Sequence, residues 1–222
     1  MTFSADLGLA YPELILAIGA MVLLVLGAFA PKAARLVGWG GVLVLAAAAF
    51  QAATGPFGRG FAGGIIADDA SAFAQVAIFV ASAIAIPLGQ PWFERRGVHN
   101  FEFPVLIVLA ALGMGMMAAA GDLISLYIGL ELHSLALYVL AALQRDNAKA
   151  SEAGLKYFVL GTLASGLVLY GASLVYGFAG STVFSDIAVA VHGGANTGVL
   201  FGLVFLICGL AFKVSAAPFH MW

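Results

Sequence analysis

Three ionisable side chains lie inside apolar stretches of this sequence, where a charge is costly. Glu131, Lys156 and Lys213 each interrupt a run of apolar residues long enough to cross a bilayer. A charge at the centre of a membrane helix costs about 2.5 to 3.5 kcal/mol on insertion scales, so such residues usually face a protein interior or a water path. A carboxylate and amines in that position indicate proton transfer.

Glu131 lies on a polar stripe of the expected helix 123–143. Tyr127, Ser134 and Tyr138 stand at i−4, i+3 and i+7 from it, which places all of them on one helical face. At about 1.5 Å per residue the carboxylate is roughly 12 Å from the start of the helix. A buried carboxyl group that only fixes packing is the alternative, but the depth favours a functional role.

Pro218 is expected to break the helix that carries Lys213. Proline lacks a backbone N–H and clashes with the carbonyl four residues earlier, here that of Val214. Broken membrane helices border protein or water-filled cavities and are typical of ion-transport sites. His220 follows Lys213 by two turns on the same face and adds a titratable imidazole. The alternative is a lysine that extends to the cytoplasmic interface past an incidental kink.

Lys156 has two interpretations that the sequence leaves open. It lies near the start of the expected helix 153–178, with Glu152 at i−4 as a partner, so it either takes part in proton transfer or extends to the cytoplasmic surface. His133 points to a different face from Glu131 and is expected to be packed or hydrogen-bonded. The aspartates at the span edges, Asp68 and Asp122 among them, are expected to be solvated.

The composition predicts the elements that must position these residues. The chain has 222 residues, 63% of them hydrophobic and 9% charged, with a mean hydropathy of +1.08, far outside soluble averages. We therefore expect an all-α polytopic membrane protein of about seven transmembrane helices, with no soluble domain. The expected spans lie near residues 9–29, 37–53, 70–90, 103–120, 123–143, 153–178 and 198–222.

The loop charges predict the orientation of these spans. Six cations fall in the first, third and fifth connections and only Arg59 in the others, which places the N-terminus outside and the C-terminus inside. Gly198 and Gly202 have GxxxG spacing, which favours ordinary close helix packing. The six cations are Lys32, Arg35, Arg95, Arg96, Arg145 and Lys149.

Several function classes are excluded. The formal net charge of −2 and the scattered cations argue against binding to nucleic acid. The single Cys208 cannot form an internal disulfide. Only His133 and His220 lie at membrane depth, too few for a bis-haem arrangement, and we expect no metal or cofactor in this chain.

Two segments resemble a known family: residues 122–138, DLISLYIGLELHSLALY, and residues 209–222, GLAFKVSAAPFHMW. They are similar to subunit N of bacterial respiratory complex I, the proton-translocating NADH:quinone oxidoreductase, within its antiporter-like family. Gly-Leu-Glu-Leu followed by Ser-Leu and Tyr is similar to subunit N rather than L or M, and residues 152–157 fit as well. The match is specific over residues 122–222 and only general before them.

The resemblance implies a function and a set of site residues. Glu131 would pair with Lys213 and gate proton movement through a hydrated polar axis. Lys156 and His220 are further candidates for proton transfer because of their positions in the sequence. The chain would be a translocase subunit without a redox centre, in the bacterial cytoplasmic membrane beside other membrane subunits. NAD, FMN, iron–sulfur clusters and quinone would belong to partner subunits.

The resemblance also implies a division of the chain. Residues 1–102 would form three leading helices, and residues 103–222 the first part of the antiporter-like repeat. Family members continue past the Pro-Phe-His-x-Trp motif, so we expect an N-terminal piece and an incomplete antiporter-like fold, truncated before an eighth helix.

The sequence leaves two other functions open. It also leaves open whether Glu131 and Lys213 are in direct contact. A subunit of an Mrp-type cation/proton antiporter shares the same glutamate and broken-helix lysine, and a membrane scaffold would use the charges for assembly. If both helices rise evenly, the backbones of Glu131 and Lys213 differ by roughly 8 to 10 Å in depth. Only the long lysine stem, unwinding of the helix or water would close that gap.

Overall fold

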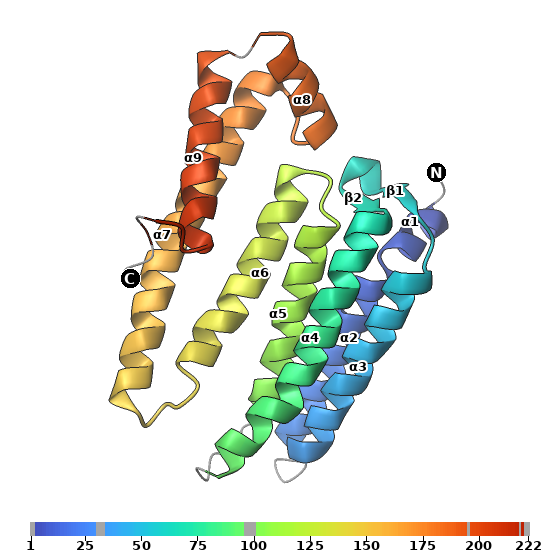
Figure 1. Cartoon of the computed structure of the whole chain (residues 1–222), viewed down its shortest axis with the longest axis vertical. Helices are drawn as coiled ribbons and strands as arrows, with labels where there is room; N and C mark the ends of the chain where they lie inside the picture. Colours follow the sequence, from blue (N-terminus) through green and yellow to red (C-terminus); the bar gives the residue numbers. More distant parts are fainter. Residues whose placement is uncertain (1–2, 30–33, 96–100, 195, 218, 220–222) are drawn as a thin grey trace.

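The computed structural model describes residues 3–29, 34–95, 101–194, 196–217 and 219, which are almost entirely helical (Figure 1). The helices are α1 (Phe3–Leu9), α2 (Tyr11–Phe29), α3 (Ala34–Thr54), α4 (Asp69–Glu94), α5 (Glu102–Ala118), α6 (Leu123–Ala141), α7 (Ala148–Ala179), α8 (Phe184–His192) and α9 (Thr197–Lys213). The exception is a small hairpin in which β1 (Gly58–Gly60) and β2 (Ile65–Ala67) pair antiparallel around the 3-10 helix η2 (Phe61–Gly63).

The predicted all-α polytopic fold is confirmed. Within the described ranges, α2, α3, α4, α6 and α7 are long and apolar enough to cross a membrane, while α5 and α9 are apolar but have 17 residues each. These seven helices coincide with the seven expected segments, although α7 begins at Ala148 instead of residue 153. The number of spans and their orientation stay predictions. The sequence did not predict α1, the hairpin or α8.

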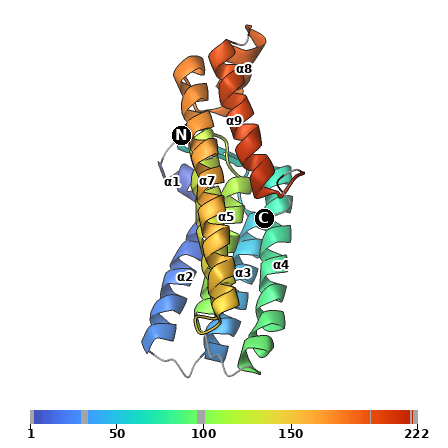
Figure 2. The same cartoon turned by 90° about the vertical axis from the view of Figure 1, so that its left-hand side faces the viewer.

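Two larger hydrophobic cores hold the helices together, and a smaller cluster of Leu23, Val37 and Val105 joins α2, α3 and α5. The first joins α2, α3, α4 and α5 around the fully buried Leu16, Leu45, Phe79 and Val108. The second joins α6, α7, α8 and α9 through residues such as Val168. Figures 1 and 2 show α7 and α9 side by side, extending with α8 beyond the hairpin end of the other helices. Because α6 contacts both α5 and α7, it connects the two cores.

Glycines allow the closest helix contacts. A Cβ on Gly171 of α7 would lie 2.7 Å from the carbonyl oxygen of Gly202 in α9, and a Cβ on Gly202 would lie 2.9 Å from that of Gly171. Gly113 of α5 and Gly129 of α6 meet in the same reciprocal way. Membrane helices lack a hydrophobic driving force between them and depend on such close packing. Gly202 is the second glycine of the GxxxG spacing, and its contact with Gly171 agrees with the close packing expected there.

Two of the aspartates that were expected to be solvated also begin helices. Asp68 caps α4: its carboxylate accepts a hydrogen bond from the Ser71 backbone N–H at 2.8 Å, which lowers the pKa of this carboxyl. Asp122 caps α6 by accepting from the Ser125 N–H at 2.7 Å. Both follow the Asp-x-x-Ser pattern of an N-cap, which the sequence contained. The second cap fixes where the helix of Glu131 begins.

The glycine contact between α7 and α9 leads to the first prediction. We expect Gly171→Ala to destabilise the protein by about 1 to 3 kcal/mol, because its new methyl group meets backbone atoms that cannot move aside. Gly166→Ala, on an exposed face of α7 with nothing within 4 Å of the new Cβ, should be neutral or slightly stabilising. Thermal unfolding of both variants in the same detergent measures the difference, and equal melting temperatures would contradict the close contact.

Candidate functional site

The polar face of α6 supplies the acidic half of the site. Ser134 and Tyr138 are buried, with 4% and 5% of their surface exposed, and Glu131 is partly buried one turn before Ser134. Their spacing of three and four residues aligns them along one side of the helix, as the sequence predicted. The site is therefore built on regular helix, which holds these side chains in a fixed order.

The end of α9 supplies the basic half. The Ser215 N–H donates to the Phe212 carbonyl at 3.0 Å and the Ala216 N–H to the Ala211 carbonyl at 2.9 Å, the two bonds of a Schellman motif. The backbone of Ser215 has a left-handed conformation, with φ of 52°. The helix thus ends at Lys213, one residue before Val214, whose carbonyl was expected to clash with Pro218.

Lys213 reaches across to the polar face of α6. Its Nζ donates to Ser134 Oγ at 2.8 Å and to Tyr138 Oη at 3.2 Å, and lies 3.7 Å from Glu131 Oε1. The Lys213 side chain is 14% exposed and the Glu131 side chain 21% exposed. The lysine stem therefore closes the expected difference in depth, and the two groups form a direct ion pair.

The ion pair is close but not a hydrogen bond. Glu131 Oε1 is buried and has no hydrogen-bond partner among the described residues, so its described electrostatic partner is the Lys213 ammonium. Two unit charges about 4 Å apart attract by roughly 4 kcal/mol at an effective dielectric constant of 20. A small displacement of either side chain changes this energy substantially. The arrangement can therefore couple a local movement to the binding of a proton.

Helix α7 holds Tyr138 in place. The Tyr138 ring makes edge-on contacts with Tyr157 and Phe158, at centroid separations of 4.7 and 5.7 Å. Gly161 leaves the space that the Tyr138 hydroxyl occupies, since a Cβ there would overlap it. The sequence analysis missed these three supporting residues, although Tyr157 and Phe158 directly follow Lys156. These residues contact Tyr138 from a different helix, so no local pattern in the sequence indicates the contact.

Comparisons with known proteins give this geometry a family. A family model described as "NADH:quinone oxidoreductase/Mrp antiporter, TM" matches residues 120–222. NADH-quinone oxidoreductase subunit N of Caulobacter sp. (strain K31) is 62% identical over 100% of this chain and 47% of its own length. The subunit of the same name from Maricaulis maris (strain MCS10) is 57% identical over 99% of this chain and 46% of its own length. The chain belongs to the subunit N family.

The structural comparison agrees with the sequence comparison. A chain of respiratory complex I from Thermus thermophilus with bound aureothin has a TM-score of 0.76 and 32% identity, over 95% of this chain and 45% of that chain. The chain spans about half the length of the curated relatives it matches. Its family, its apolar helices and its bacterial relatives identify it as a multi-pass protein of the bacterial inner membrane.

The remaining predicted site residues lie elsewhere or outside the described residues. Lys156 pairs with Glu152 at 2.6 Å on the surface of α7, with 68% of its side chain exposed, and does not join the Lys213 site. Tyr127 packs against the core of α7, α8 and α9. Pro218 and His220 are not among the described residues. The roles predicted for these four residues in proton transfer, helix breaking or support stay predictions.

Two further expectations concern His133 and the absence of a metal site. His133 lies on α6 facing α5, where its backbone meets Gly113, and its Nδ1 is buried without a hydrogen-bond partner among the described residues. Within the described ranges, no group of three or more His, Cys, Asp or Glu side chains could hold a metal ion. The expectation that cofactors belong to partner subunits stays a prediction.

The contact between Lys213 and Ser134 can be measured as a coupling energy. We expect Ser134→Ala and Lys213→Met to be non-additive in unfolding free energy, by about 0.5 to 3 kcal/mol, because each removes the same charge-assisted hydrogen bond. The matched control pairs Lys213→Met with Ser82→Ala, a buried serine of α4, and should show additivity. Full additivity in both cycles would mean that the lysine does not contact α6.

Proposed function

We propose that this chain is part of a proton-translocating membrane subunit of NADH-quinone oxidoreductase, in which Glu131 and Lys213 form the proton-transfer pair. The observation that carries the proposal is the contact itself, with the Lys213 ammonium 3.7 Å from the Glu131 carboxylate and both side chains largely buried. The membership of the chain in the subunit N family supports the assignment.

The geometry supports a switch in the charge of Lys213. Separation or neutralisation of the pair removes an attraction of roughly 4 kcal/mol from the ammonium, which changes its proton equilibrium about a thousandfold. Ser134 and Tyr138 carry hydroxyl groups, which can accept a hydrogen bond from the ammonium and donate one to the neutral amine. The surrounding α6 face can therefore accommodate Lys213 before and after it gives up a proton.

The partners follow from the family assignment. We propose that this subunit assembles with other membrane subunits of the complex and carries no redox centre of its own. NAD, FMN, iron–sulfur clusters and quinone would bind to partner subunits, and the free energy of quinone reduction there would move the Glu131–Lys213 pair. Proton movement in this chain would then depend on coupling through neighbouring subunits.

A second candidate is a subunit of an Mrp-type cation/proton antiporter. The matching family model covers both kinds of protein, and the same acid and amine would serve either. The proteins that co-purify with the complete subunit separate the two, since NADH-oxidising and iron–sulfur subunits belong only with the oxidoreductase. A scaffold role is the third candidate, favoured if neutral variants of the pair abolish assembly instead of pumping.

The proposed function predicts the effect of neutralising either member of the pair. In the assembled complex, Glu131→Gln and Lys213→Met should each lower proton pumping at least tenfold, because neither variant can alternate between paired and unpaired charges. Lys149→Met, which removes an exposed cation near the start of α7, is the control and should pump normally. Pumping is measured in proteoliposomes with a pH-sensitive dye. Undiminished pumping by either variant in a fully assembled complex would refute the role of the pair.

The predicted role of Lys156 in proton transfer requires a separate test. Because its ammonium is exposed and already paired with Glu152, we expect Lys156→Met to reduce pumping less than Lys213→Met does. Reversal of the pair, Glu152→Lys with Lys156→Glu, keeps the ion pair but moves the cation by one turn. Pumping that falls as far in Lys156→Met as in Lys213→Met, with assembly intact, would make Lys156 an equal member of the pathway.

A further inference from the structure

A second buried carboxyl group lies at the hairpin end of the helices, away from the ion pair of α6 and α9. Glu13 is in the first turn of α2, and the Gln75 side chain of α4 donates to its Oε1 at 2.7 Å. The same Gln75 nitrogen donates to the Gly115 carbonyl of α5 at 3.2 Å, which fixes the orientation of the amide.

The other oxygen of this carboxyl group has no partner. Glu13 Oε2 is buried without a hydrogen bond, and none of the ion pairs among the described residues includes Glu13. A buried carboxylate without a cation is costly, and a single neutral amide does not offset that cost. Glu131 provides the contrast within the same chain, because it has an ammonium 3.7 Å away.

The groups around Glu13 are uncharged. Gln75 reaches it from α4, and Ser125 of α6 lines the same cavity together with apolar residues such as Leu14 and Met116. A water-sized sphere can occupy about 280 Å³ of this cavity, room for several water molecules. The only acidic side chain described on the neighbouring α1, Asp6, faces Gly60 of β1. Among the described residues no cation pairs with Glu13, so the first turn of α2, its own backbone N–H and the Gln75 amide give a negative charge there only partial compensation.

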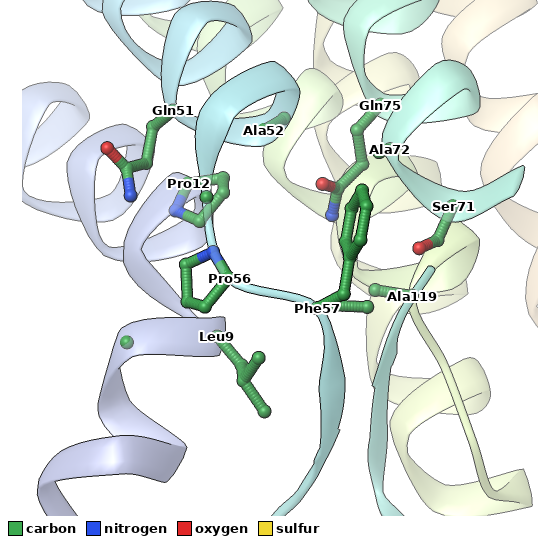
Figure 3. A pocket seen from close by; sticks show the side chains of 13 residues that line it. Leu9, Pro12, Gln51, Ala52, Pro56, Phe57, Ser71, Ala72, Gln75 and Ala119 are labelled. Atoms are coloured by element: carbon green, nitrogen blue, oxygen red, sulfur yellow. The ribbon is translucent and has the colours of Figure 1, made fainter. Parts of the chain in front are cut away.

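A smaller cavity lies on the other side of Gln75. It is lined by Gln51 of α3 and by Ser71 and Gln75 of α4, close to Phe57 (Figure 3). A water-sized sphere can occupy about 20 Å³ of it, enough for about one water molecule. Ala119 borders both cavities. One cavity therefore borders Glu13 and the other borders Gln75.

We propose that Glu13 is a second proton-binding site, distinct from the Glu131–Lys213 pair. The carboxyl group holds a proton on Oε2 while Oε1 accepts the hydrogen bond from Gln75. It exchanges that proton with water in the cavity beside it: the acid gives H⁺ to a water molecule, leaving a carboxylate and a hydronium ion, and the reverse step restores the acid. This proposal depends on the geometry around Glu13 and not on the proposed function of the ion pair.

Infrared spectroscopy of the complete subunit in membranes tests the proposal at neutral pH. We expect a carboxylic-acid C=O stretching band that shifts down in D₂O, disappears in Glu13→Gln and moves in Gln75→Leu, which removes the hydrogen bond to Oε1. Glu102→Gln is the matched control: Glu102 lies 3.8 Å from Arg145, so its loss should change only the carboxylate region.

Three results would overturn the proposal. The first is loss of a carboxylate band instead of an acid band in Glu13→Gln, which would mean that Glu13 is ionised. The second is an acid band that does not respond to D₂O, which would mean that the site is sealed from water. The third is an acid band unchanged by Gln75→Leu, a variant that also keeps the proposal testable if Glu13→Gln does not fold. None of these spectra depends on pumping, so failure here is distinct from failure of the Glu131–Lys213 proposal.

Discussion

The reach of the Lys213 side chain to the face of α6 is the contact on which the site depends. It joins the end of α9 to residues 131, 134 and 138, and it does so through three polar atoms at 2.8, 3.2 and 3.7 Å. An ammonium at membrane depth needs such partners, since lipid supplies none. The ending of α9 at Lys213 matters for the same reason, because a helix that stops there leaves the lysine stem free to extend toward α6.

The glycine contacts determine where this lysine can lie. Because Gly171 and Gly202 bring the backbones of α7 and α9 together, the axis of α9 is set by α7 and not directly by α6. Helix α7 in turn packs on Tyr138 through Tyr157, Phe158 and the space left by Gly161. The same helix therefore positions both halves of the site. A change in the packing of α7 would move the ammonium and its tyrosine partner together.

The sequence predicted the parts of the structure that follow from local periodicity and burial cost. The seven apolar segments and the stripe of Glu131, Ser134 and Tyr138 depend only on helical repeat and hydropathy, and the structure reproduces both. The direct ion pair could not be derived, because it depends on the relative depth of α6 and α9, which tertiary packing sets. The buried pairing of Glu13 with Gln75 was missed because its partners are 62 residues apart. In the sequence, each of these two contacts is indicated only by polar residues within apolar segments.

The two glutamates differ in how the protein compensates them, and under the two proposals this difference separates two kinds of proton site. At Glu131 a cation lies 3.7 Å away, so the electrostatic energy of this pair depends on the position of Lys213. At Glu13 a neutral amide is the hydrogen-bonding side chain, so the proton equilibrium depends on access of water to the cavity. The first kind of site can respond to a conformational change in neighbouring helices, whereas the second responds to hydration. A chain with both could bind protons at separate positions without a direct charge interaction between them.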